Sequence, residues 1–446
     1  MSSSRLLARS ASSIVRPDVC VFCRARQLLP VNCNSAFRLP AKATHSNVIK
    51  RTYAQKLDVK RLRADVDKKG RFGWYALTKK QGVLLVERDK AEAIYNDFVA
   101  HKDKKEYGKL VKQFTTKYGV SLEDMAGLAL VTYTIPELSD PTKRAMLPPS
   151  QHKTVAGLIL QGCAENEEPL AIKHIMTAVY LNAHTTAPGA RDIALLFPKS
   201  EILKYQKTLE KLASKDDPEA LTLQGLFAEK DNQPAKARLL YEKALKVSWV
   251  FTYAPGARHP AQLPITAPWN ALGCLLKNDK DPAIRAQAQH AFEQGANKAD
   301  DPLSYFELAA FFDRSSVEWL KCISKAAASG HREAMVRLAE FYRDTATKDA
   351  PILEADRSGK LRQALDWVLS WRPGSAEKLA VEWYEAAGSA GHKAALLQLA
   401  DWYECLGEKG KAREVLQRVV APVAGVEEWP QAVHQAKGRL SGIRTA

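Results

Sequence analysis

The fold of this chain is decided by a ten-residue stretch near its C-terminal end, Trp383-Tyr384-Glu385-Ala386-Ala387-Gly388-Ser389-Ala390-Gly391-His392. The order of residue types predicts the end of one helix, a tight Gly-His turn, and the small-residue start of the next helix. Ala and Gly at such positions let neighbouring helices approach closely, while aromatic and Leu side chains fill the grooves between them. The stretch therefore indicates a chain of helical hairpins stacked in a row.

A second copy of this pattern lies earlier in the sequence. Residues 331–342 match residues 392–403 in residue type, and each copy follows a pair of alanines. Further hairpins are predicted from Ala-rich and Leu-rich runs at 155–176, 220–245, 269–296 and 305–327. One hairpin cannot bury its own apolar face, so about three or more must stack. We therefore predict an all-α fold, an α-solenoid of antiparallel helical hairpins over residues 151–425, followed by a C-terminal helix or tail at 426–446.

The pattern resembles the Sel-one-like branch of the tetratricopeptide-repeat family, whose repeats end in Trp-Tyr, a pair of Ala, and Gly-His. Six residues match that ending: Trp383, Tyr384, Ala386, Ala387, Gly391 and His392. The preceding copy departs from it, because Cys322 and Ile323 stand where Trp and Tyr are expected. The resemblance covers roughly residues 217–420 and is strongest at their C-terminal end. It implies an adaptor or assembly scaffold and carries over no enzymatic residues.

The net charge of +16 is distributed unevenly along the chain. Residues 1–53 have nine Lys or Arg against one acid, and residues 54–118 have 17 against nine. Residues 119–446 have 40 basic and 40 acidic side chains, so the body of the protein is neutral and its composition does not indicate a polyanion binder. The basic excess belongs to a presequence and to a basic helical N-terminal region at 54–150.

Residues 1–53 have the composition of a mitochondrial transit peptide, with Arg spread among Ser, Ala and Leu. The run Arg51-Thr52-Tyr53-Ala54 resembles a matrix-processing site, so we expect cleavage near Ala54. A basic tail that binds RNA or acidic lipid is the alternative. No run reaches the roughly 18 apolar residues of a membrane span. We expect a mitochondrial matrix protein without a transmembrane span, and peripheral attachment to the inner membrane stays open.

One short segment combines cations with aromatic rings. Three rings, Phe72, Trp74 and Tyr75, follow six candidate contact residues: Lys60, Arg61, Arg63, Lys68, Lys69 and Arg71. Cations neutralise phosphates and rings stack on bases, which suits an arm at 56–80 that contacts mitochondrial RNA, the ribosome or a partner. The alternative is a solvated helix face beside packed aromatics, because three nearby aspartates dilute the charge.

Cysteines and histidines do not form a recognisable reactive site. Cys20 and Cys23 have the spacing of half a zinc site, but no second pair completes four ligands. His331 and His392 occupy predicted turns, where we expect a structural role at helix ends. The sequence contains no familiar catalytic or nucleotide-binding motif. We therefore predict no cofactor, no metal and no enzymatic activity.

Two insertions are expected between the predicted repeats, at residues 247–268 and 344–360. The first is rich in Pro and aromatic residues, and we expect an exposed, semi-rigid loop that docks a partner. The leading hypothesis is a non-enzymatic mitochondrial scaffold that binds protein partners during assembly of a respiratory or ribosome-linked complex. The second is an RNA-contacting gene-expression factor that uses residues 56–80, and the third is an enzyme of unrecognised type.

Overall fold

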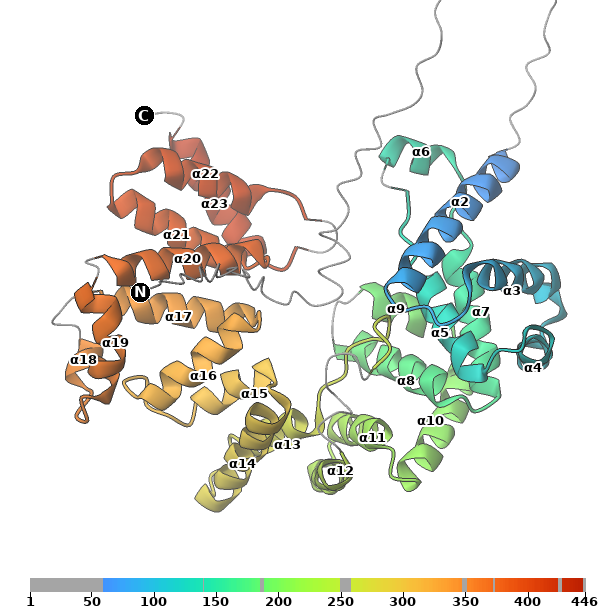
Figure 1. Ribbon diagram of the computed structural model, residues 1–446, viewed down its shortest axis with the longest axis horizontal. Helices are drawn as coiled ribbons and strands as arrows, with labels where there is room; N and C mark the ends of the chain where they lie inside the picture. Colours follow the sequence, from blue (N-terminus) through green and yellow to red (C-terminus); the bar gives the residue numbers. More distant parts are fainter. Residues whose placement is uncertain are drawn as a thin grey trace, which may run out of the picture. The chain divides into compact units, whose positions relative to one another are not determined.

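The computed structural model describes residues 59–138, 140–184, 188–248, 258–346, 351–371, 374–423 and 427–443. Within these ranges the structure is helical and contains no β-strand, which confirms the predicted all-α class (Figure 1). The chain divides into two compact units between residues 288 and 289. The predicted transit peptide, residues 1–53, lies outside the described residues.

The N-terminal unit contains α2 to α13 and the first part of α14, a helix that continues past the boundary at residues 288 and 289. Their bounds are α2 (Val59–Lys80), α3 (Arg88–His101), the 3₁₀ helix η1 (Lys102–Lys104), α4 (Tyr107–Tyr118), α5 (Leu122–Tyr133), α6 (Pro141–Met146), α7 (His152–Glu165), α8 (Pro169–His184), α9 (Pro188–Ala194), α10 (Lys199–Ser214), α11 (Pro218–Lys230), α12 (Pro234–Val247), α13 (Pro268–Leu276) and α14 (Pro282–Ala299). Many begin at proline, whose fixed φ suits the first helical position and whose missing N–H is not needed there.

Helices of the N-terminal unit pack in neighbouring pairs. α11 packs on α12, α8 packs on α9, and both α4 and α5 pack on α7. Helices from both sides of residue 150 therefore share one core, although the sequence suggested a regional boundary there. The side chains of Phe98, Met125 and Ile159 are completely buried in this unit.

α2 is one continuous helix of 22 residues within the predicted basic helical region. Its buried residues are polar for the most part: Arg63, Asp67, Arg71, Tyr75 and Thr78. A spacing of three or four residues places them on a single side of the helix. The dense charge does not keep α2 out of the core, since its inward-facing charges are paired: Arg71 with Glu92 on α3, and Arg63 with Asp67 of α2 itself.

The C-terminal unit runs from residue 289 to the last described helix. It contains α15 (Pro302–Ala309), α16 (Val317–Ala328), α17 (Arg332–Asp344), α18 (Pro351–Glu354), α19 (Lys360–Trp371), α20 (Ser375–Ser389), α21 (Lys393–Cys405), α22 (Lys409–Val420) and α23 (Pro430–Ile443). α15 packs on α16, α21 on α22, and α22 on the C-terminal helix α23 (Figure 1). Trp319 is buried, whereas Trp383 and Trp402 are only half-buried.

The turn between α16 and α17 is closed by backbone geometry and by a histidine ring. Gly330 adopts φ 93°, a left-handed conformation that disfavours side chains, and His331 N donates to Ala326 O at 3.0 Å. His331 Nδ1 then accepts from Ala334 N at 3.2 Å. The ring is thus the N-cap of α17, where it replaces the usual Ser or Asp oxygen.

The turn between α20 and α21 repeats that geometry. Gly391 has φ 95°, His392 N donates to Ala387 O at 3.0 Å, and His392 Nδ1 accepts from Ala395 N at 3.1 Å. The predicted structural role of both histidines is confirmed. In both turns the ring accepts from a backbone N–H in the first turn of the following helix.

The second predicted insertion lies inside a packed helix pair. α17 packs directly against α20, and α18 and α19 lie between them in the sequence. The expectation that this insertion separates two hairpins was therefore wrong. The contact between α17 and α20 is formed by residues far apart in the sequence, which short-range periodicity does not reveal. In the described part of the chain, none of the helices has the length and apolar character needed to cross a membrane.

Candidate functional site

The N-terminal unit has a cleft where three helices begin. We call it the acidic cleft. It encloses about 470 Å³ and is lined at the starts of α5, α8 and α11 and by the segment after residue 257. The lining residues are Leu85, Glu123, Asp124, Gly127, Glu168, Pro169, Leu170, Lys173, Asp217, Pro218, Glu219, Arg258, His259 and Gln262.

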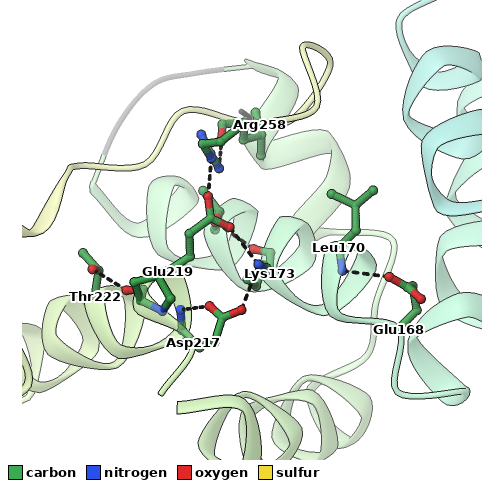
Figure 2. Close-up of polar contacts among 11 residues, drawn as sticks. Glu168, Leu170, Lys173, Asp217, Glu219, Thr222 and Arg258 are labelled. Carbon is green, nitrogen blue, oxygen red and sulfur yellow. Dashed lines mark hydrogen bonds and ion pairs between the residues drawn. The ribbon is translucent and has the colours of Figure 1, made fainter. Parts of the chain in front are cut away.

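Carboxylates cap all three helix starts. Glu168 accepts from Leu170 N at 3.2 Å at the beginning of α8, and Asp217 accepts from Ala220 N at 2.8 Å at the beginning of α11 (Figure 2). In α5, Asp124 completes a reciprocal capping box with Ser121. These caps satisfy N–H groups that lack helical partners, and they fix the carboxylates in place.

One end of the cleft is a closed ion-pair network, which we call the paired end. Lys173 Nζ lies 3.1 Å from Asp217 Oδ2 and 3.0 Å from Glu219 Oε2, and Arg258 pairs with Glu219 (Figure 2). Burial alone would lower the pKa of Lys173, but the charges of Glu219 and Asp217 outweigh it and raise that pKa. The lysine is therefore held as an ammonium ion.

The other end, the open end, is formed by Glu123, Asp124 and Glu168. None of these three carboxylates forms an ion pair with a described side chain. Burial raises the pKa of Glu168, and the nearby charge of Glu123 raises it further. The open end thus has no ion pair of its own in this part of the chain, and the charge of Lys173 offsets only part of the rise in the pKa of Glu168.

The balance of charge decides what the cleft attracts. Five carboxylates face two cations, which gives a net charge of −3. Burial lowers the pKa of His259, so this ring is neutral at pH 7. Each of the three helix N-termini contributes roughly +0.5 of a charge. About −1.5 remains, so the cleft favours a cation in a protein whose overall charge is positive.

The described part of the first insertion forms a wall of this cleft. Leu263 N donates to His174 Nδ1 at 3.3 Å, Arg258 pairs with Glu219, and Gln262 is buried. The expectation of an exposed loop is wrong for residues 258–263. The loop packs because its polar groups find partners on α8 and α11. Residues 249–257, which include Phe251 and Tyr253, lie outside the described residues.

Two of the six predicted contact residues are buried ion-pair partners. Arg71 binds Glu92 through two hydrogen bonds of 2.7 and 2.9 Å, and its guanidinium lies 4.0 Å from the ring centre of Tyr95. Arg63 pairs with Asp67 at 2.8 Å. Both guanidinium groups are therefore committed to the interior, unlike the charged groups of the exposed cations in the predicted set.

The other four predicted contact residues, Lys60, Arg61, Lys68 and Lys69, are exposed on α2. The aromatic residues that follow them do not form a stacking surface together. Tyr75 is buried and hydrogen-bonds Thr132, and one face of Phe72 is covered by Arg88 at 3.9 Å. Four cations of the predicted arm are thus exposed together on one helix, whereas the rings of Tyr75 and Phe72 are buried or partly covered.

The acidic cleft is not evident from the sequence. Its carboxylates come from positions 123, 168 and 217, which are distant in the chain. An acid directly before proline marks two of the helix starts, Glu168-Pro169 and Asp217-Pro218. The same signal at Asp301-Pro302 marks a helix that does not line the cleft, so it locates helix starts and not the site.

The comparisons give no relative from which to transfer a function. The sequence matches no protein-family model and no curated protein. Among the described residues, no group of three or more His, Cys, Asp or Glu side chains is arranged to hold a metal ion. The function is therefore argued from the geometry of the cleft and of the helix pairs.

Proposed function

We propose that this protein is a non-enzymatic scaffold of the mitochondrial matrix that binds protein partners, built as a helical-repeat solenoid of the Sel-one-like kind. The observation that carries the proposal is the acidic cleft, whose charged groups are fixed at helix starts. Lys173 is an ion-paired ammonium and Arg258 a guanidinium, so neither serves as a nucleophile or base. Such a lining suits recognition better than chemistry.

The packing of neighbouring helices supports the solenoid. Two Gly-His turns, ending at His331 and His392, share the same backbone and ring hydrogen bonds. A repeated turn of this kind is what a series of stacked helix pairs requires. Stacked pairs expose long surfaces, which suits a role in the assembly of a respiratory or ribosome-linked complex.

Sedimentation of the tagged protein from gently solubilised mitochondria tests this function. We expect the protein in a complex larger than its own mass, indifferent to RNase, with defined protein subunits that co-purify. Absence from mitochondria, or migration as a monomer, would refute the scaffold. A shift on EDTA together with a ribosomal subunit would place the assembly at the ribosome.

The exposed cations of α2 support a second candidate function, an RNA-contacting role in mitochondrial gene expression. Replacing Lys68 and Lys69 by Glu is expected to weaken RNA binding and flatten its salt dependence, because fewer counterions are released. The matched control replaces Lys204 and Lys207, exposed on α10 in the same unit. Equal binding by the two variants would rule out a specific role for α2.

A further inference from the structure

We propose that the open end of the acidic cleft binds one lysine or arginine side chain of a protein partner. The inference rests on the proposed scaffold function and names the chemistry of the partner that the cleft recognises. It is carried by three separate features, namely unpaired charge, an unsatisfied buried amide and an apolar rim.

The chain's own described cations form no ion pair with the carboxylates of the open end, although the charge of Lys173 acts on Glu168. Lys173 bridges Asp217 and Glu219, and Arg258 binds both Glu219 and the carbonyl of Leu263 at 3.1 Å. Moving either cation toward Glu168 would leave the buried Glu219 carboxylate with fewer partners, which is strongly unfavourable. The paired end therefore stays closed, and compensation for the open end must come from outside the cleft.

The amount of uncompensated charge fits a single monovalent group. After the helix N-termini are counted, about −1.5 remains in the cleft. An anion is repelled by that charge, and the described carboxylates are not arranged as ligands of a metal ion. An ammonium or guanidinium offers several N–H donors to carboxylates, and this complements the geometry of the open end.

Gln262 supplies an observation that is independent of charge. Its side chain lines the cleft and is 6% exposed, and its Nε2 has no hydrogen-bond partner. Buried amides of this kind are nearly always paired in folded proteins. A peptide carbonyl next to the bound cation would provide the missing acceptor. A peptide satisfies both needs at once, whereas a bare inorganic cation satisfies only the first.

The rim of the cleft suits the aliphatic stem of a long cationic side chain. Leu85 lines the cleft and is 64% exposed, and Pro169 and Pro218 add apolar surface at the helix starts. Lys and Arg bury their methylene groups against such surface while their charged ends reach polar groups. A cleft of about 470 Å³ is large enough for the side chain and part of its backbone.

The test measures fluorescence polarisation of four labelled peptides that differ only at a central Lys, Arg, norleucine or Glu, with the full-length chain. We expect Lys and Arg peptides to bind about tenfold more tightly than the other two, as one charge-assisted hydrogen bond gives. The Glu123→Gln/Glu168→Gln variant is expected to lose that advantage. The control variant Glu210→Gln/Asp231→Asn removes the same charge from exposed positions outside the cleft and is expected to bind as wild type.

Gln262→Met tests the amide separately and is expected to weaken the Lys and Arg peptides by the same factor, about threefold to tenfold. Circular dichroism establishes that each variant is folded. Equal binding of the Lys and norleucine peptides, or full binding by the folded Glu123→Gln/Glu168→Gln variant, would overturn the proposal. Spermidine that binds as tightly as the Lys peptide would assign the cleft to a free polyamine and also overturn it.

Sedimentation of wild type and variant separates this inference from the scaffold function. If the wild-type protein shows no preference for cationic peptides, and its complex persists in the Glu123→Gln/Glu168→Gln variant, the cleft inference is refuted and the scaffold function is not. A wild-type protein that migrates as a monomer refutes the scaffold. Loss of a partner from the variant complex, with the control variant unaffected, supports both.

Discussion

Replacing Gly225 by Ala tests how closely α11 and α12 approach each other. A Cβ atom at Gly225 would lie 2.2 Å from Tyr241 Cε1 and 2.6 Å from Tyr241 Cδ1. Carbon atoms in contact are normally about 3.5–4.0 Å apart, so the ring would have to move by more than about 1 Å. Tyr241 is completely buried and its hydroxyl is bound by Glu229, so a shift of the ring would disturb both its packing and its hydrogen bond.

The expected change in the free energy of unfolding follows from two opposing effects, overpacking of the core and lower backbone entropy of the unfolded chain. Overpacking a well-filled core costs about 1–3 kcal/mol, and the upper part of that range applies because the displaced ring is buried and tethered. Replacing glycine by alanine inside a helix returns about 1 kcal/mol through lower backbone entropy in the unfolded chain. Gly225→Ala is therefore expected to lower the free energy of unfolding of the N-terminal unit by about 2 kcal/mol.

Urea unfolding followed by far-UV circular dichroism measures this change, with each resolved transition fitted separately because the chain has two units. Gly73→Ala in α2 is the matched control. A Cβ at Gly73 has nothing within 4 Å, so this variant should gain about 0.5–1 kcal/mol. In a Tyr241→Leu background, Gly225→Ala should cost at least about 1 kcal/mol less. A Gly225→Ala variant as stable as Gly73→Ala would refute the close packing of α11 on α12.

Three further predictions concern single contacts. Glu92→Gln removes the charge that compensates the buried Arg71 and should lower the free energy of unfolding by about 3–5 kcal/mol. Glu87→Gln, in an exposed pair with Lys79, should lower it by less than about 1 kcal/mol. Urea unfolding measures both changes. His331→Ala should cost about 1 kcal/mol of stability in the C-terminal unit and His331→Asn much less, because Asn restores the N-cap acceptor; equal losses would contradict the cap. Burial lowers the pKa of His174 to about 3, so below pH 6.5 the unfolded chain binds a proton that the folded chain does not. Stability should fall by about 1.4 kcal/mol per unit as pH drops from 6 toward 3, and urea midpoints at pH 7 and 5 should differ less in His174→Asn.

Helix positions were largely predictable because each depends on residues within one or two turns. The repeated Ala-Ala and Gly-His pattern located two turns correctly, at Gly330-His331 and Gly391-His392. Each histidine accepts from a backbone N–H only three residues later, so the cap is a local interaction. The buried residues of α16 and α21 follow the same short-range periodicity. Local patterns sufficed here because the interactions that they encode are themselves local.

The predicted arm shows where local patterns fail. The sequence grouped six cations with three rings. In the structure, Arg71 pairs with Glu92 on α3, and Tyr75 hydrogen-bonds Thr132 on α5. These helices contact α2 only in the folded protein. Runs of charged residues are usually solvent-exposed, yet a buried charge is tolerated wherever a partner of opposite sign is buried with it. That partner lies 21 residues away from Arg71 in the sequence, beyond any helical spacing.

The sequence by itself determined the helical class, the Gly-His turns with their capping histidines, and the many helix starts at proline. Tertiary structure alone decided which charges pair, that α17 packs against α20 across α18 and α19, and that three helix starts meet in one cleft. The physical reason is the separation in sequence between the residues that interact. Caps and turns are settled by atoms within a few residues, whereas Glu123, Glu168 and Asp217 share a cleft only because packing of their helices brings distant parts of the chain together.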